Sequence, residues 1–143
     1  MSRLVNTKRA YDTIANLLDQ EVRKRRGATK DLEECRRLLD TAFYLLGWGQ
    51  FEYIVRRETS EVIEENSRTK AIDGHAWRQL NVRGMTVRQQ LDILFYRNQK
   101  VRDSLDKDYT VRNGAAHDNQ LPAEARDVSG WLRRLEDILE KVI

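Results

Sequence analysis

Hydrophobic residues recur at every third or fourth position over four long stretches of this chain, and this is the period of an amphipathic α-helix. The clearest stretch closes the chain and comprises Val128, Trp131, Leu132, Leu135, Ile138, Leu139 and Val142. No segment alternates strictly between apolar and polar residues, and the 143 residues include a single proline. The sequence therefore predicts an all-α fold in which residues 1–143 form one domain, an up-and-down bundle of four to five helices.

The first two helices are expected over residues 3–26 and from Lys30 onward. Glycines flank Trp48 in the second helix, so we expect a bend or a break at residues 47–49. Aromatic residues are dense in this helix, at Phe43, Tyr44, Trp48, Phe51 and Tyr53. Such rings can stack on nucleic-acid bases, but their helical spacing among Leu and Ile favours a bundle core or a dimer seam.

The second half of the chain contains a connection and two further helices. Residues 67–85 include two glycines and no sustained period, which predicts an irregular connection around a short helix. Thr86 and Gln89 match a capping box that begins a third helix, whose apolar residues continue to position 105. Pro122 fits the first turn of the last helix.

The charge balance restricts the function only weakly. The chain carries 26 basic and 23 acidic residues, a net charge of +3 that does not by itself indicate a nucleic-acid-binding protein. Of the basic residues 19 are Arg and 7 are Lys. This excess of Arg suits phosphate recognition, although a preference for Arg codons together with ordinary surface ion pairs gives the same count.

The single cysteine, Cys35, excludes an intramolecular disulfide and fits a reducing compartment. Leucines at positions 32, 38 and 39 surround it in the sequence, so we expect this side chain in the core. No Cys/His cluster has the spacing of a zinc site, and no apolar run has the length of a signal segment or a membrane span. We therefore expect a soluble, cytoplasmic protein that does not associate with membranes.

The candidate functional residues lie near the C-terminal end, where Arg112 stands five residues ahead of His117 and is followed directly by Asn113. Arginine offers a planar fork of donors that fits phosphate oxygens, and histidine exchanges protons near neutral pH. These two groups suffice to cleave RNA without a metal, because the 2′-hydroxyl of RNA can serve as the nucleophile. We expect residues 112–117 to lie between the third and last helices and to begin a short helix of their own.

The Arg–His spacing alone is not specific, because 19 Arg and two His produce about one such match by chance. A second match joins Arg68 to His75, but it falls in the irregular connection, and we expect His75 at the surface or at a helix end. The structural alternative for Arg112 and His117 is a buried pair that serves only stability or dimerisation.

At the end of a small all-helical chain, Arg112, Asn113 and His117 resemble the R-x4–6-H signature of the HEPN superfamily, in which a polar residue such as Asn commonly follows the Arg. The resemblance implies a homodimer of four- or five-helix bundles, with the motifs beside the dimer axis, so that two Arg/His pairs form one composite site. Many members are metal-independent endoribonucleases of toxin–antitoxin, phage-defence and RNA-processing systems. It therefore implies RNA as substrate, no cofactor, and an antitoxin or another regulatory protein as a further partner.

In an ideal helix, Arg112 and His117 point about 140° apart. Both reach one phosphate only if the helix begins at Arg112, if it is irregular at Gly114, or if Arg112 of one subunit works with His117 of the other. In this hypothesis His117 takes the proton from the 2′-hydroxyl or protonates the leaving 5′-oxygen, and Arg112 stabilises the phosphate. Asn113 orients the phosphate or caps the local helix. The expected products carry a 2′,3′-cyclic phosphate and a 5′-hydroxyl.

Two other functions remain open at this point. One is a non-catalytic helical module that keeps the bundle and binds RNA or a partner protein. The other is a helical DNA-binding regulator, against which the low net charge and the lack of a short helix-turn-helix pattern both count.

Overall fold

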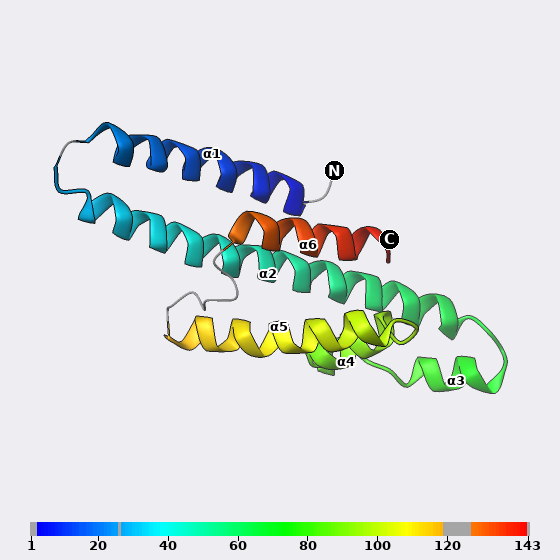
Figure 1. The fold of residues 1–143 in the computed structure, drawn as a ribbon. Helices are drawn as coiled ribbons and strands as arrows, with labels where there is room; N and C mark the ends of the chain where they lie inside the picture. Colours follow the sequence, from blue (N-terminus) through cyan, green and yellow to red (C-terminus); the bar gives the residue numbers. More distant parts are fainter. Residues whose placement is uncertain (1–2, 26, 119–126, 143) are drawn as a thin grey trace.

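The computed structural model describes residues 3–25, 27–118 and 127–142, and within them the fold is all-α (Figure 1). The elements are α1 (Arg3–Lys24), α2 (Lys30–Ser67), α3 (Ile72–Arg78), the 3-10 turn η1 (Val82–Gly84), α4 (Val87–Leu94), α5 (Gln99–Asp118) and α6 (Val128–Glu140). The predicted all-α class is thus confirmed, although the described residues form six α-helices rather than four or five.

The longest helix, α2, is the centre of the molecule and contacts each of the other five α-helices. In Figure 1, α1 and α6 lie along one side of α2 and α4 and α5 along the other. Its inner faces carry the predicted aromatic core, because Tyr44, Trp48 and Phe51 are buried. Trp48 stacks on Trp131 of α6, with ring centroids 5.6 Å apart, whereas Tyr53 is about half exposed.

The expected bend or break at residues 47–49 is wrong, since α2 continues without interruption from Lys30 to Ser67. Gly47 is needed for packing and does not end the helix. A Cβ atom built on Gly47 would lie 2.2 Å from Cδ2 of Leu132, a fully buried residue of α6. The absence of a side chain at Gly47 therefore lets α2 and α6 approach closely.

The predicted third helix begins where the sequence indicates, but the structure divides it into two helices, α4 and α5. The capping box of Thr86 and Gln89 is present at the start of α4. α4 ends at Leu94, and α5 begins only at Gln99. The side chain of Asn98 accepts a hydrogen bond from the backbone N–H of Val101 at 3.3 Å, so Asn98 starts a second helix in the middle of the apolar pattern.

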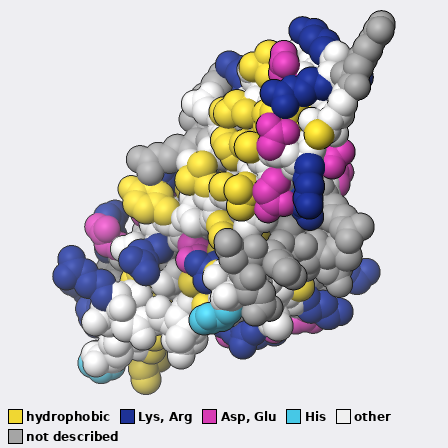
Figure 2. Space-filling view, turned by 90° about the vertical axis from the view of Figure 1, so that its left-hand side faces the viewer, with side chains coloured by type: hydrophobic (Ala, Val, Ile, Leu, Met, Phe, Trp, Pro, Cys, Tyr) yellow, Lys and Arg dark blue, Asp and Glu magenta, His cyan; other side chains and the backbone are white. Residues whose placement is uncertain are grey.

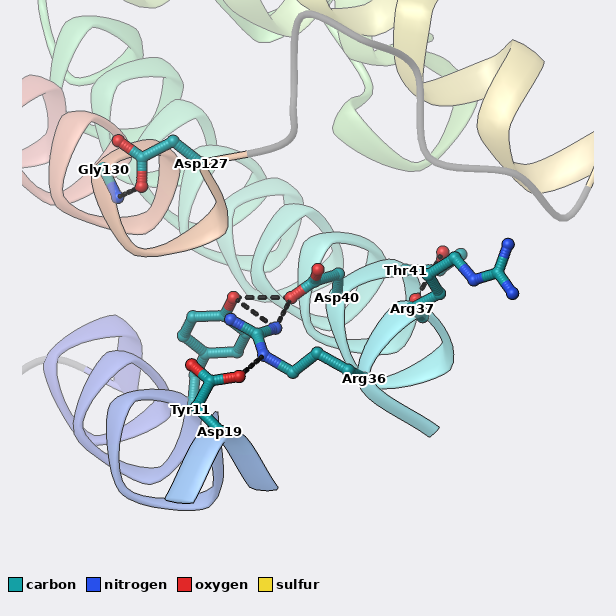
Figure 3. A network of polar contacts seen from close by, with 8 residues as sticks. All are labelled: Tyr11, Asp19, Arg36, Arg37, Asp40, Thr41, Asp127 and Gly130. Carbon is teal, nitrogen blue, oxygen red and sulfur yellow. Dashed lines mark hydrogen bonds and ion pairs between the residues drawn. The ribbon is translucent and has the colours of Figure 1, made fainter. Parts of the chain in front are cut away.

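The connection over residues 67–85 contains α3 and η1, in agreement with a short helix inside an irregular segment. The last helix begins at Val128, where the carboxylate of Asp127 accepts from the backbone N–H of Gly130 at 2.9 Å (Figure 3). The predicted position of Pro122 in its first turn lies outside the described residues. The apolar face of α6 is confirmed, with buried residues Val128, Leu132, Leu135, Ile138 and Leu139.

A polar network joins α1 to the N-terminal part of α2 (Figure 3). Tyr11 is buried and donates its hydroxyl hydrogen to Asp40, and Arg36 pairs with both Asp40 and Asp19. This network explains why the prediction of a core Cys35 is wrong. Because the next residue, Arg36, faces α1, Cys35 falls on the outer side of α2 and is exposed.

Candidate functional site

The motif residues lie in the last two turns of α5, and not at the start of a separate short helix as the sequence suggested. α5 is helical throughout Gln99–Asp118, so Arg112 is inside a helix, and Gly114 does not interrupt it. Ideal helix geometry then places the Cα–Cβ directions of Arg112 and His117 about 140° apart and their Cα atoms about 7.5 Å apart along the axis. A single copy therefore directs the two residues to different faces of α5.

Arg112 is on the inward face of α5, on the same side as buried Leu105 and Ala115. Its side chain is 31% exposed, and its Nε lies 3.7 Å from Oε1 of Glu52 on α2. Both atoms are buried, and neither has a hydrogen-bond partner among the described residues. Glu52 thus supplies a counter-charge to Arg112 without forming a full hydrogen bond.

Asn113 connects Arg112 to the outer flank of α5. Nη1 of Arg112 donates to Oδ1 of Asn113 at 3.0 Å, which draws one edge of the guanidinium toward that flank. Asn113 and His117 are four residues apart and so lie on the same flank, one turn apart. His117 is exposed in the final turn of α5. Each copy therefore presents an exposed imidazole, an amide and the edge of a half-buried guanidinium.

Glu52 is the site residue that sequence analysis missed. It is the one charged residue between Asp40 and Arg56, in an otherwise apolar and polar-uncharged stretch of α2. A lone carboxylate in such a stretch is a usable signal, because a charge inside an apolar helix region usually has a partner. The partner, Arg112, is on another helix, and the sequence alone does not show which helix faces α2 there.

The second Arg–His match does not form a site. Arg68 caps the end of α2 and pairs with Glu64 at 3.1 Å, with both side chains largely exposed. His75 is exposed near the end of α3, as expected from the sequence. A buried Arg–His pair is not observed at the first match either, because His117 is exposed while Arg112 is half-buried.

The surface around these elements is mixed in charge. On the face shown in Figure 2, Lys and Arg side chains alternate with Asp and Glu, and a band of hydrophobic side chains crosses the upper half. No continuous basic patch is visible on this face. The positive charge on this face is therefore dispersed among acidic side chains.

A groove of about 1020 Å³ lies between the C-terminal part of α2, α3, α4, the start of α5 and the end of α6. Asp73 and Trp77 of α3 line it, so the 67–85 connection forms one of its walls. Arg112, Asn113 and His117 do not line this groove. The motif and the groove are thus separate features of the molecule.

The residues that the structure describes contain no group of three or more His, Cys, Asp or Glu side chains arranged to hold a metal ion. Within the same ranges, no helix combines the length and the apolar character needed to cross a bilayer.

No protein-family model matches this chain, and neither a curated protein nor a solved structure is similar to it. The resemblance to the HEPN superfamily therefore depends on the motif at residues 112–117 and on the helical architecture.

Proposed function

We propose that this protein is a metal-independent endoribonuclease of HEPN type that acts as a homodimer. The observation that carries the proposal is the arrangement at the end of α5. The guanidinium of Arg112 faces the Glu52 carboxylate at 3.7 Å and donates a hydrogen bond to Asn113, and His117 is exposed one turn beyond Asn113. A restrained cation beside an exposed acid–base group suits phosphoryl transfer from RNA.

In the proposed reaction, His117 removes the proton from the 2′-hydroxyl, and the resulting oxyanion attacks the adjacent phosphorus. The bond from phosphorus to the 5′-oxygen breaks, that oxygen takes up a proton from water, and His117 releases the proton it accepted to the solvent. Arg112 stabilises the charge that builds on the phosphate oxygens, while Asn113 orients the guanidinium. One strand end then carries a 2′,3′-cyclic phosphate and the other a 5′-hydroxyl, and no metal or cofactor takes part.

The divergence of Arg112 and His117 on a regular helix supports a site shared between two copies. In this arrangement each scissile phosphate is bound by Arg112 of one copy and meets His117 of the other. The same proposal places the enzyme in the cytoplasm, in a toxin–antitoxin or phage-defence system, where an antitoxin or another regulatory protein restrains it.

The test is incubation of the purified protein with single-stranded and structured RNAs in EDTA, with both product ends mapped. We expect cleavage by the wild type and a loss of at least about 100-fold in Arg112→Ala and in His117→Ala. Arg68→Ala and His75→Ala are matched controls, because they remove the same residue types from the second match, and they should cleave like the wild type. Equal cleavage by all variants, or no cleavage by the wild type, contradicts the proposal.

The alternative function is a non-catalytic interaction module for RNA or a partner protein. It is favoured by the Glu52 carboxylate, which offsets the charge of Arg112 and so weakens its attraction for a phosphate. The same RNAs distinguish the two functions. A module binds RNA or a protein without cutting RNA, and its binding does not depend on His117.

A further inference from the structure

α2 exposes a row of residues on the side away from the bundle: Cys35, Leu38, Ala42, Leu46, Gly49 and Tyr53. Ideal helix geometry places all six within an arc of about 80° and over a length of about 27 Å. The three large side chains are about half exposed, at 53%, 48% and 52% in chain order. We refer to this row as the α2 outer face, and its exposed apolar residues are typical of an interaction surface.

Two positions in the middle of the α2 outer face carry little or no side chain. Ala42 is small, and a Cβ atom added to Gly49 would meet nothing within 4 Å. The backbone of another helix can therefore come close to α2 at Ala42 and Gly49, between the larger side chains. Leu46 lies between these two positions and offers an apolar contact for that helix.

The charges at the two ends of the α2 outer face have opposite sign. Asp31 precedes Cys35 on the same side of the helix, and its side chain is 68% exposed although it pairs with Arg25 of the same copy at 3.3 Å. Arg56 follows Tyr53 on that side and is exposed. The midpoint between Asp31 and Arg56 lies within one residue of the midpoint of the apolar row, between Ala42 and Leu46. The α2 outer face is therefore complementary in charge to a second copy of itself that runs in the opposite direction.

We propose that the α2 outer face is the homodimer interface and that a second copy of this chain binds it in antiparallel orientation. The two-fold axis passes between Ala42 and Leu46, so each Ala42 packs against the partner's Leu46. Each Asp31 then meets the partner's Arg56 at the end of the interface, a contact that fixes the register. A helix face of this length is near the lower limit for a stable interface, so the dimer is reversible.

This pairing places both motifs on one side of the dimer. Glu52 lies about 80° around α2 from the middle of the outer face, and it holds Arg112. A two-fold axis that lies in the interface and crosses α2 at a right angle keeps the Glu52 edges of both copies on the same side of the helix pair. The need for a second copy rests on the proposed function, whereas the choice of this face rests on α2 alone.

The first test is sedimentation velocity over a range of protein concentrations. We expect a reversible wild-type dimer, and Leu46→Arg should raise its dissociation constant by at least about tenfold, because it buries an unpaired charge beside the axis. Ile72→Arg is the matched control, since this α3 residue is 83% exposed and off the outer face. A wild type that stays monomeric, or a dimer that tolerates Leu46→Arg, overturns the proposal.

The second test uses charge reversal to examine the orientation. Asp31→Arg and Arg56→Glu should each weaken the dimer about fivefold, because each brings like charges together across the interface. The double variant should return the dissociation constant to within about twofold of wild type. A double variant weaker than either single variant excludes the antiparallel register. Both tests measure association without RNA. A monomeric wild type would also contradict the homodimer of the proposed function, whereas a dimer that tolerates Leu46→Arg overturns only the choice of the α2 outer face.

Discussion

Arg112 occupies a position at which a helical bundle normally holds an apolar side chain. It is on the inward face of α5, near Leu105 and Ala115, yet its Nε and the facing Oε1 of Glu52 are buried without hydrogen bonds. Buried polar atoms without partners cost free energy, so such a pair contributes little to stability. An arginine at this position is what the proposed phosphate-binding role requires.

The pair of Arg112 and Glu52 can be tested by removing both charges. We predict that the double variant Arg112→Met/Glu52→Gln unfolds in urea with a free energy within about 1 kcal/mol of wild type, because similar-sized groups replace an imperfect pair. The variant should not cleave RNA. Glu52→Gln alone should retain cleavage, since the amide oxygen still faces Arg112.

Two results would argue against this interpretation. A loss of several kcal/mol in the double variant would make the pair a structural element of the bundle. If Glu52→Gln abolished cleavage as completely as Arg112→Met, the Glu52 carboxylate would take part directly in the reaction.

Tyr11 gives a pH-dependent prediction at the other end of α2. Burial and the hydrogen bond to the Asp40 carboxylate raise the pKa of Tyr11 to about 12, from an ordinary value of about 10. The unfolded chain therefore loses this proton at a lower pH than the folded protein does. Stability from this group is complete below about pH 10 and is lost as the pH rises toward 12.

We predict that the urea midpoint of the wild type falls between pH 10 and 12 more steeply than that of Tyr11→Phe. Tyr11→Phe should also lower the free energy of unfolding at neutral pH by about 1 kcal/mol, through the lost hydrogen bond. Parallel pH profiles for the two proteins would show that the Tyr11 pKa is ordinary in the folded state.

The sequence identified Arg112, Asn113 and His117 as candidates because a short pattern carries their chemistry. It did not identify Glu52, since that contact joins residues far apart in the chain, and it misplaced Cys35. The outer position of Cys35 follows from its neighbour Arg36, which faces α1. That orientation depends on packing between helices and is not a property of the local sequence.

The helices show how packing overrides local preference. Gly47 and Gly49 disfavour helix by about 1 kcal/mol each relative to Ala, yet α2 passes through both. Gly47 is compensated by its close contact with Leu132, while Gly49 is surrounded by open space in the single copy. The two glycines thus have different reasons to be present, one inside the bundle and one on the α2 outer face.

A matched pair of substitutions separates packing from helix propensity. Gly47→Ala should lower the free energy of unfolding by about 1–2 kcal/mol, because the added methyl group displaces buried Leu132. Gly114→Ala should raise it by about 0.5–1 kcal/mol, because nothing lies within 4 Å of the added atom and α5 is regular there. Thermal or urea unfolding measures both effects. Destabilisation by Gly114→Ala would mean that the helix is irregular within the motif.

Helix positions were predictable where a local signal exists. The capping box at Thr86 and the apolar period of α6 each correspond to an observed element. The division of the third helix was not predicted, because the apolar period continues across it. The turn depends on Asn98, whose side chain begins α5 by binding a backbone N–H. The apolar period alone therefore does not show that α4 ends at Leu94 and that α5 begins at Gln99.

The molecule as a whole is a bundle built around one long helix, with the motif at its margin. α2 packs against α1 and α6 on one side and against α4 and α5 on the other, and it leaves the apolar row of its outer face exposed. Arg112 is anchored to α2 near the edge of that row through Glu52. In the proposed dimer, the second copy covers the α2 outer face and carries its own Arg112 and His117 on the same side of the helix pair.

The most direct measurement is RNA cleavage in EDTA by an equimolar mixture of the Arg112→Ala and His117→Ala proteins, allowed to exchange subunits. Half of the dimers are then mixed, and each mixed dimer retains one Arg112 and one His117 on different copies. We predict that the mixture regains activity, up to about a quarter of the wild-type rate, while each variant alone stays inactive. A mixture as inactive as its components, beside an active wild type, would contradict a site shared between two copies.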